Sequence, residues 1–170
     1  MDFCSATDVQ PKRDCAHSIL LALALAAREG GEVVEWPGVV SWRDTHAQLA
    51  HAQSAVLPQA RFAPGDSVVI AGDFLDDDPQ PWIESAVAAG ACGCLLHIAD
   101  PAETHFTFTG ALRFEACEPG EQALAVGEAG DIGAAYAAAW SAHVAQLQRA
   151  SDQPGWTYIA ANTAASLSVA

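Results

Sequence analysis

Basic residues are scarce in this sequence, which has seven Lys and Arg against 21 Asp and Glu and a formal net charge of −14. Its one lysine is Lys12, and no Lys or Arg occurs from residue 62 to residue 112. A surface of this charge repels phosphate backbones and anionic lipid headgroups. The composition therefore argues against a basic groove for nucleic acid, and we expect neither a nucleic-acid nor a membrane partner.

A regular cysteine framework is also missing. The five cysteines, an odd number, show no regular spacing. Small secreted domains held by disulfides use even numbers of cysteines at characteristic spacings. We therefore expect reduced cysteines and a cytoplasmic protein. Only one residue separates Cys92 from Cys94, which is not the usual zinc spacing, so these two are expected to be buried strand residues.

No hydrophobic run is long enough to cross a bilayer. The apolar run Ile19–Ala27 follows Lys12 and Arg13, an order that resembles a signal peptide. The acidic residues before the run outnumber those two basic ones, and the run is too short for a membrane span. We predict a core helix over residues 15–28 with Asp14 as its cap, and a signal-like segment is the alternative.

The chain has 170 residues, and 51% of them are hydrophobic. This length and composition suit one folded domain with its own core. No internal repeat and no linker divides the sequence. We predict a flexible lead over residues 1–13, a single α/β domain over residues 14–160 and a frayed tail over residues 161–170.

Two apolar runs, Ser67–Ala71 and Cys92–Ile98, are typical of buried strands. Between them, Pro81 suits the first turn of a helix and Gly90 suits its end. Two buried strands around one helix predict a parallel crossover. The expected fold is therefore α/β, with a mixed, mainly parallel sheet flanked by helices. Further strands are expected at 32–35, 39–42, 106–109, 113–116, 122–126 and 156–160, with helices at 46–57 and from a cap at Asp131 to about residue 151.

Several motifs follow one another in the first hundred residues. Val40–Asp44 stands in the place of an aromatic opening motif and precedes the 46–57 helix. Phe62–Ile70 combines a Pro-Gly-Asp turn with a strand, and Ala89–Ala91 ends the next helix before a buried strand. This order from about residue 19 to residue 100 resembles the N-terminal subdomain of adenylate-forming acyl-CoA synthetases, the AMP-binding superfamily.

The functional motifs of that family have no counterpart here. Its phosphate-binding loop is a Ser/Thr/Gly run with a lysine, and Thr107–Gly110 is the nearest stretch, without a lysine. The acidic ATP-ribose motif and the C-terminal lid are also missing. The resemblance therefore implies a truncated or diverged, non-catalytic or accessory protein without a cofactor. Such a protein would act by binding or assembly, with a protein partner or with itself.

Asp73 supports an alternative interpretation. Val68–Phe74 and the acidic run after it resemble the A-G-D-F-N-D-x-P strand end of the endonuclease/exonuclease/phosphatase family. An aspartate there would hold Mg²⁺ or Mn²⁺, which polarises a phosphoryl oxygen. Under this alternative, Asp73, Asp76 and Asp78 are metal ligands of a phosphodiesterase, although Leu75 replaces the family's phosphate-orienting Asn. Otherwise the acidic run is a solvated loop.

Overall fold

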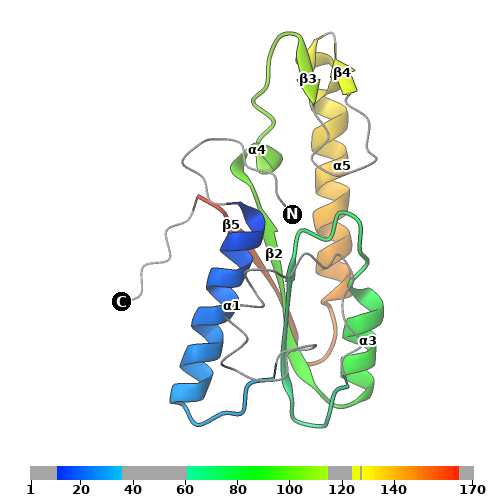
Figure 1. Cartoon of the computed structure of the whole chain (residues 1–170). Helices are drawn as coiled ribbons and strands as arrows, with labels where there is room; N and C mark the ends of the chain where they lie inside the picture. Colours follow the sequence, from blue (N-terminus) through cyan, green and yellow to red (C-terminus); the bar gives the residue numbers. More distant parts are fainter. Residues whose placement is uncertain (1–10, 36–60, 115–123, 127, 165–170) are drawn as a thin grey trace.

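The computed structural model describes residues 11–35, 61–114, 124–126 and 128–164. Figure 1 shows its helices and strands in chain order. They are α1 (Lys12–Glu29), β1 (Ser67–Gly72), α3 (Gln80–Ala88), β2 (Cys92–Ala99), α4 (Pro101–Thr104), β3 (Leu112–Phe114), β4 (Leu124–Val126), α5 (Ala129–Ala150) and β5 (Trp156–Asn162).

The main sheet has three strands in the order β1-β2-β5, and both pairings are parallel. Strands β3 and β4 pair antiparallel in a separate two-stranded ribbon. The expected α/β class and the parallel crossover from β1 through α3 to β2 are confirmed. Antiparallel pairing, which we expected within the sheet, occurs among the described residues in the ribbon.

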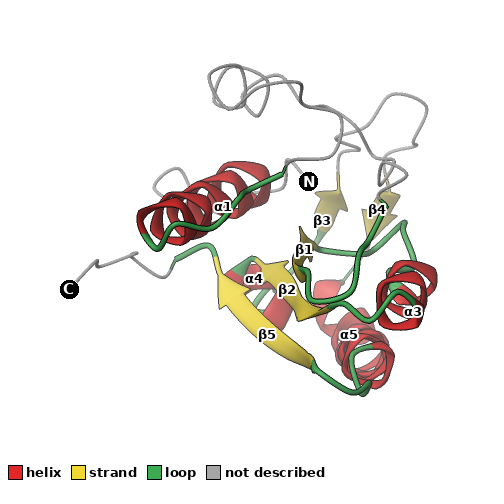
Figure 2. Cartoon of the chain, turned by 90° about the horizontal axis from the view of Figure 1, so that it is seen from below, coloured by secondary structure: helices red, strands yellow, loops and turns green. Residues whose placement is uncertain are grey.

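Helices cover both faces of the sheet, as Figure 2 shows. Helix α1 lies on one face and contacts β1 and β2, while α3 and α5 lie on the other face and contact each other. Side chains alternate between the faces along each strand. On β2, Leu95 therefore enters the core under α3 and α5, and Leu96 enters the core under α1.

The two cores differ in size. The core under α3 and α5, here called the large core, contains Ile70, Phe74, Ile83, Ala86, Ala91, Leu95, Leu147, Ala150 and Trp156. The core under α1, here called the small core, contains Cys15, Ala16, Leu96 and Ile98. Aromatic and branched side chains fill the first, whereas α1 contributes mainly small side chains to the second.

The turn before β1 and the C-terminal end of α3 have the backbone conformations that their residue types favour. In the Pro-Gly-Asp turn, Asp66 Oδ2 accepts a hydrogen bond of 2.7 Å from the Ala63 N–H, and Gly65 has φ +89°. After α3, Gly90 has φ +81°, and its N–H donates to the Val87 carbonyl. Left-handed backbone at both places favours glycine, so the predicted turn and helix end are confirmed.

The two predicted caps are wrong. Helix α1 starts directly after Pro11, so that Asp14 lies in its first turn, and α5 starts directly after Glu128, so that Asp131 lies in its first turn. A carboxylate in the first turn still complements the positive end of the helix dipole. The helices themselves agree with the 3.6-residue patterns, and only their first residues were misplaced.

Other local predictions are also wrong. Residues 32–35 and 106–109 form no strand. The alternation at 106–109 serves ring packing instead, because Phe106 lies 5.2 Å from Phe108 and 5.0 Å from Tyr136, ring centre to ring centre.

Cys92 is exposed rather than buried, while Cys15, Cys92 and Cys94 are free thiols as expected. The predictions for 39–42 and 46–57 fall outside the described residues.

Candidate functional site

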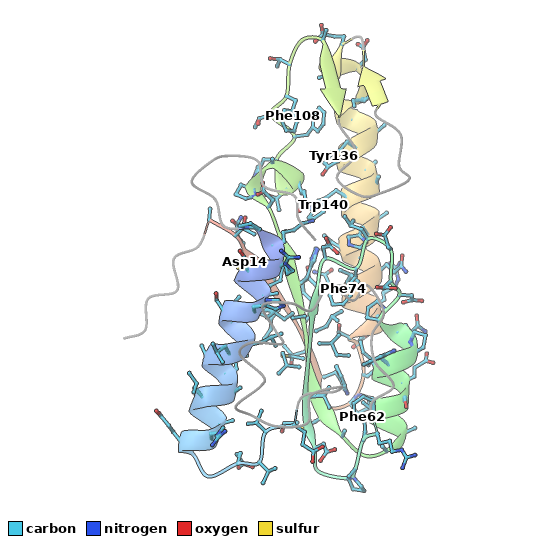
Figure 3. The ribbon with its side chains drawn as sticks, in the orientation of Figure 1. Asp14, Phe62, Phe74, Phe108, Tyr136 and Trp140 are labelled. Carbon is cyan, nitrogen blue, oxygen red and sulfur yellow. The ribbon has the colours of Figure 1, made fainter. Side chains whose placement is uncertain are left out.

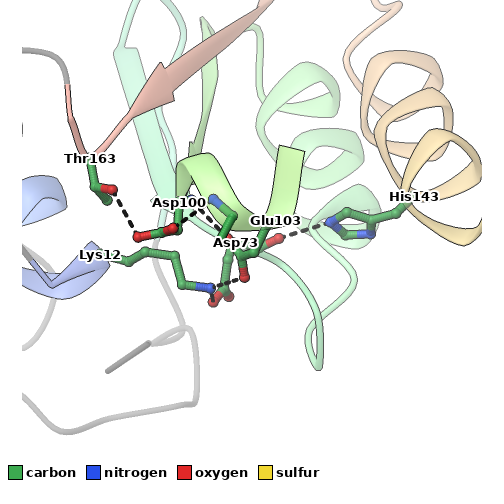
Figure 4. Close-up of polar contacts among 7 residues, drawn as sticks. Lys12, Asp73, Asp100, Glu103, His143 and Thr163 are labelled. Carbon is green, nitrogen blue, oxygen red and sulfur yellow. Dashed lines mark hydrogen bonds and ion pairs between the residues drawn. The ribbon is translucent and has the colours of Figure 1, made fainter. Parts of the chain in front are cut away.

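Three residues follow directly after the three parallel strands. Asp73 follows β1, Asp100 follows β2 and Thr163 follows β5. Because parallel strands end at the same edge of a sheet, these residues gather at its carboxyl edge (Figure 4). In open α/β sheets, ligands bind at this edge. It is therefore the candidate functional site.

A buried lysine joins two carboxylates at this edge. Lys12 Nζ lies 2.8 Å from Asp73 Oδ2 and 2.7 Å from Glu103 Oε1. The exposed fraction is 2% for the Lys12 side chain, 18% for that of Asp73 and 12% for that of Glu103. We call these three residues the ion cluster. It connects the first turn of α1 with the ends of β1 and β2, which lie far apart in the sequence.

The ion cluster keeps Lys12 charged. Burial by itself lowers the pKa of Lys12, but the hydrogen bonds and the charges of Asp73 and Glu103 outweigh burial and raise this pKa above its ordinary value. A protonated lysine donates hydrogen bonds and cannot act as a nucleophile or a base. In this arrangement, Lys12 therefore serves to bind Asp73 and Glu103 within the fold.

Glu103 is placed by a capping box at the start of α4. The Asp100 N–H donates to Glu103 Oε2 at 2.8 Å, and Asp100 Oδ1 accepts from the Ala102 N–H at 2.8 Å. Asp100 Oδ2 also accepts from the Thr163 hydroxyl at 3.3 Å. Glu103 thus caps α4 with one oxygen and binds Lys12 with the other. The pattern Asp-Pro-x-Glu in the sequence is the signal for this box, which was not among the predicted caps.

Asp73 precedes a strained residue. Phe74 has φ +55°, a left-handed conformation that is uncommon for a bulky side chain. This backbone turns the Phe74 ring into the large core, where the residue is 8% exposed. Asp73 meanwhile stays at the carboxyl edge beside Lys12. Strain of this kind persists only where the surrounding packing compensates for it.

Two histidines lie beside Asp73. His143 Nε2–H donates to the Asp73 carbonyl at 2.9 Å, which fixes the proton on this nitrogen. His97 is 1% exposed, and its Nδ1 lies 2.7 Å from the Tyr158 hydroxyl. His97 Nε2 is buried without a hydrogen-bond partner. His97 is therefore a core histidine, and only one of its two ring nitrogens has a hydrogen-bond partner.

Burial and neighbouring charges keep His97 neutral. Burial is the largest cause, the His143 ring and Lys12 act in the same direction, and Asp73 partly opposes them, so the pKa of His97 falls to about 4. The rings of His97 and Trp140 lie 5.5 Å apart, and those of His97 and His143 lie 5.4 Å apart. Figure 3 shows Trp140 on the side of α5 that faces the sheet.

The three proposed metal ligands do not share one environment. Asp73 belongs to the ion cluster, Asp78 Oδ1 accepts from the Gln80 N–H at 3.0 Å, and Asp76 is exposed. Among the described residues, no group of three or more His, Cys, Asp or Glu side chains is arranged to hold a metal ion. The carboxylate that shares Lys12 with Asp73 is that of Glu103, which was not among the predicted metal ligands. Metal binding by Asp73, Asp76 and Asp78 stays a prediction.

In the part of the chain that the structure describes, no helix combines the length and apolar character needed for a membrane span. Comparison of the sequence and the structure with protein-family models, with curated proteins and with solved structures finds no match. The site therefore has to be interpreted from its own geometry.

Proposed function

We propose that this chain is a non-catalytic accessory protein, related to the N-terminal region of adenylate-forming enzymes, that acts by binding or assembly. The ion cluster is the observation that carries the proposal. It occupies the carboxyl edge, where α/β enzymes place their reacting groups. In this chain, the charged groups at that edge bind one another and attach α1 to the sheet.

The ion cluster argues against nucleotide chemistry in particular. Lys12 is the one lysine of the chain, its side chain is 2% exposed, and two carboxylates bind it. A lysine in this state cannot reach a phosphate group in solvent. The net charge of −14 adds long-range repulsion of any polyphosphate.

Calorimetric titration of the whole chain with Mg-ATP tests this proposal. The expected result is no saturable heat at micromolar concentrations. Micromolar binding of Mg-ATP, or release of AMP or phosphate in its presence, would overturn the proposal. Light scattering over a range of concentrations reports separately whether the chain assembles with itself.

One observation favours the alternative of a metal-dependent phosphodiesterase. Asp73 and Glu103 direct carboxylate oxygens at one cation, the Lys12 ammonium, and carboxylates placed in this way can also bind Mg²⁺ or Mn²⁺. The alternative predicts Mn²⁺-dependent cleavage of a chromogenic phosphodiester that is lost in Asp73→Asn. Asp77→Asn is the matched control, because Asp77 is exposed. If Asp73→Asn and wild type show the same Mn²⁺ binding and turnover, the alternative fails.

A further inference from the structure

Strand β5 forms one edge of the three-stranded sheet. It pairs with β2 on one side, and Figure 2 shows no described element beyond its other side. The pairing with β2 runs without interruption from Gly93↔Trp156 to Ala99↔Asn162. The outer side of β5 is therefore a regular strand edge.

The backbone groups on the outer side of β5 can be assigned from the ladder. Gly93 N–H donates to the Gly155 carbonyl, and Thr163 N–H donates to the Ala99 carbonyl. Backbone groups alternate in direction along a strand, so residues 155, 157, 159, 161 and 163 face β2. The N–H and C=O groups of Tyr158, Ala160 and Asn162 consequently face outward, and they form no backbone hydrogen bond to another described segment.

This edge lacks the features that usually prevent strand addition. Proteins protect exposed edges with charged residues, prolines or bulges. From Trp156 to Asn162 there is no charged residue, no proline and no break in register. Thr157 and Ala160 are exposed, and Ile159 is 44% exposed. The outer edge of β5 is therefore uncharged, and the exposed side chains along it are partly apolar.

A shallow, open groove lies beside Tyr158 of β5, at the C-terminal part of α5. Tyr158 lines it from the strand, and its hydroxyl is held by His97 Nδ1 at 2.7 Å. The other lining residues are Ala145, Gln148, Arg149, Ser151 and Asp152. An added strand would place every second side chain in this groove, beside Tyr158 and Ala160.

We infer that the outer edge of β5 and this groove bind an extended, positively charged segment of a partner protein by strand addition. The inference rests on the proposed function and names its binding surface. Backbone hydrogen bonds to Tyr158, Ala160 and Asn162 provide the affinity, and alternate side chains in the groove provide the specificity. The net charge of −14 attracts a basic segment and repels a second copy of this chain. Of the two charged groove residues, Asp152 can pair with a basic side chain and Arg149 repels one.

A phage-displayed library of random decapeptides, selected against the whole chain, tests the inference. The expected peptides alternate β-branched residues with Lys or Arg and bind with micromolar affinity in fluorescence anisotropy. Ile159→Lys adds a charge that repels them, and Ala160→Pro removes one outward N–H while leaving the ladder to β2 intact. Each variant is expected to weaken binding at least 10-fold.

Leu75→Lys is the matched control, because Leu75 is 55% exposed and follows β1, which is the opposite edge strand of the sheet from β5. It is expected to bind the selected peptides as wild type does. Hydrogen exchange of the wild-type complex gives a second measurement that needs no variant, with slowed exchange at the amides of Tyr158 and Ala160. Circular dichroism confirms that each variant is folded.

Three outcomes would overturn the inference. The selection yields no binding peptide, the bound peptides protect other amides than those of β5, or wild type dimerises through an edge that Ile159→Lys disrupts. The last outcome would assign the edge to a second copy. None of these results depends on Mg-ATP binding or turnover, so failure here is distinguishable from failure of the proposed function.

Discussion

The two faces of the sheet are covered in different ways. On one face, α3 and α5 cover the large core, which is filled by aromatic and branched side chains. On the other face, α1 contributes Cys15 and Ala16 to the small core, and Leu23 and Leu25 of the same helix stay about half exposed. Hydrophobic burial scales with apolar area. The first layer is therefore held mainly by packing, and the second depends more on the ion cluster.

Helix α1 is attached to the sheet mainly at its N-terminal end. Three of its four buried residues, Lys12, Cys15 and Ala16, lie in its first turns, beside the carboxyl edge. A buried ion pair adds little net stability compared with apolar packing, but removing one partner leaves the other charge buried. The N-terminal end should therefore be the part of helix α1 that is most sensitive to change.

The largest expected effect compares two neighbouring leucines of β2. Leu95→Ala creates a cavity in the large core and is expected to lower the free energy of unfolding by about 4 kcal/mol, against about 2.5 kcal/mol for Leu96→Ala in the small core. The small core can close around the lost volume more easily, because a single helix covers it. Urea denaturation measures both, and a larger loss for Leu96→Ala would contradict the comparison.

The next effect depends on pH and concerns the face under α5. The pKa of His97 is about 4 in the folded chain and has its ordinary value of 6.5 in the unfolded chain. Between these values the unfolded chain binds a proton that the folded chain does not, so stability falls as the pH drops from 6.5 to 4. The expected loss from this group is about 3 kcal/mol.

Urea titrations of wild type and His97→Asn at several pH values isolate this effect. The Asn side-chain oxygen still accepts a hydrogen bond near the place of Nδ1 but does not titrate in this range. The difference in the free energy of unfolding between wild type and His97→Asn is expected to shrink or reverse as the pH falls from 6.5 to 4. Parallel pH profiles would show that His97 titrates normally in the folded chain.

The smallest effect tests the ion cluster. Lys12→Met keeps the apolar stem but leaves Asp73 and Glu103 without their shared cation, with an expected cost of about 2 kcal/mol. Both carboxylates keep some exposure, so the cost stays below that of a fully buried pair. Arg13→Met is the matched control, because the Arg13 side chain is 33% exposed, and its expected cost is within about 0.5 kcal/mol.

A triple variant gives the second readout for the ion cluster. Lys12→Met combined with Asp73→Asn and Glu103→Gln removes all three charges and is expected to recover part of the loss. Hydrogen exchange should show faster opening of the first turns of α1 in Lys12→Met, with α5 unchanged. Equal stability of Lys12→Met and Arg13→Met would mean that α1 is held by the small core alone.

Much of the described fold was predictable because its signals are local. Each of these signals involves only residues that are close together in the sequence. They are the apolar runs of β1 and β2, Pro81 and Gly90 at the ends of α3, and the periodic pattern of α5. The strand at 106–109 was predicted wrongly for a related reason. Alternating Phe and Thr satisfies the period of a strand, but the Phe106 ring packs against Phe108 and against Tyr136 of α5, and the contact with α5 is not visible in a local pattern.

The amino-acid sequence by itself determined the α/β class, the parallel unit around α3 and the acidic surface, because these follow from composition and from contacts between near neighbours. It also singled out Asp73 at a strand end. Only the tertiary structure decided what Asp73 binds. Lys12 lies 61 positions and Glu103 lies 30 positions away in the chain. The parallel order of β1 and β2 brings Glu103 to the same edge, and the packing of α1 on these strands brings Lys12 there. Charge pairing at that distance leaves no periodic trace in a sequence.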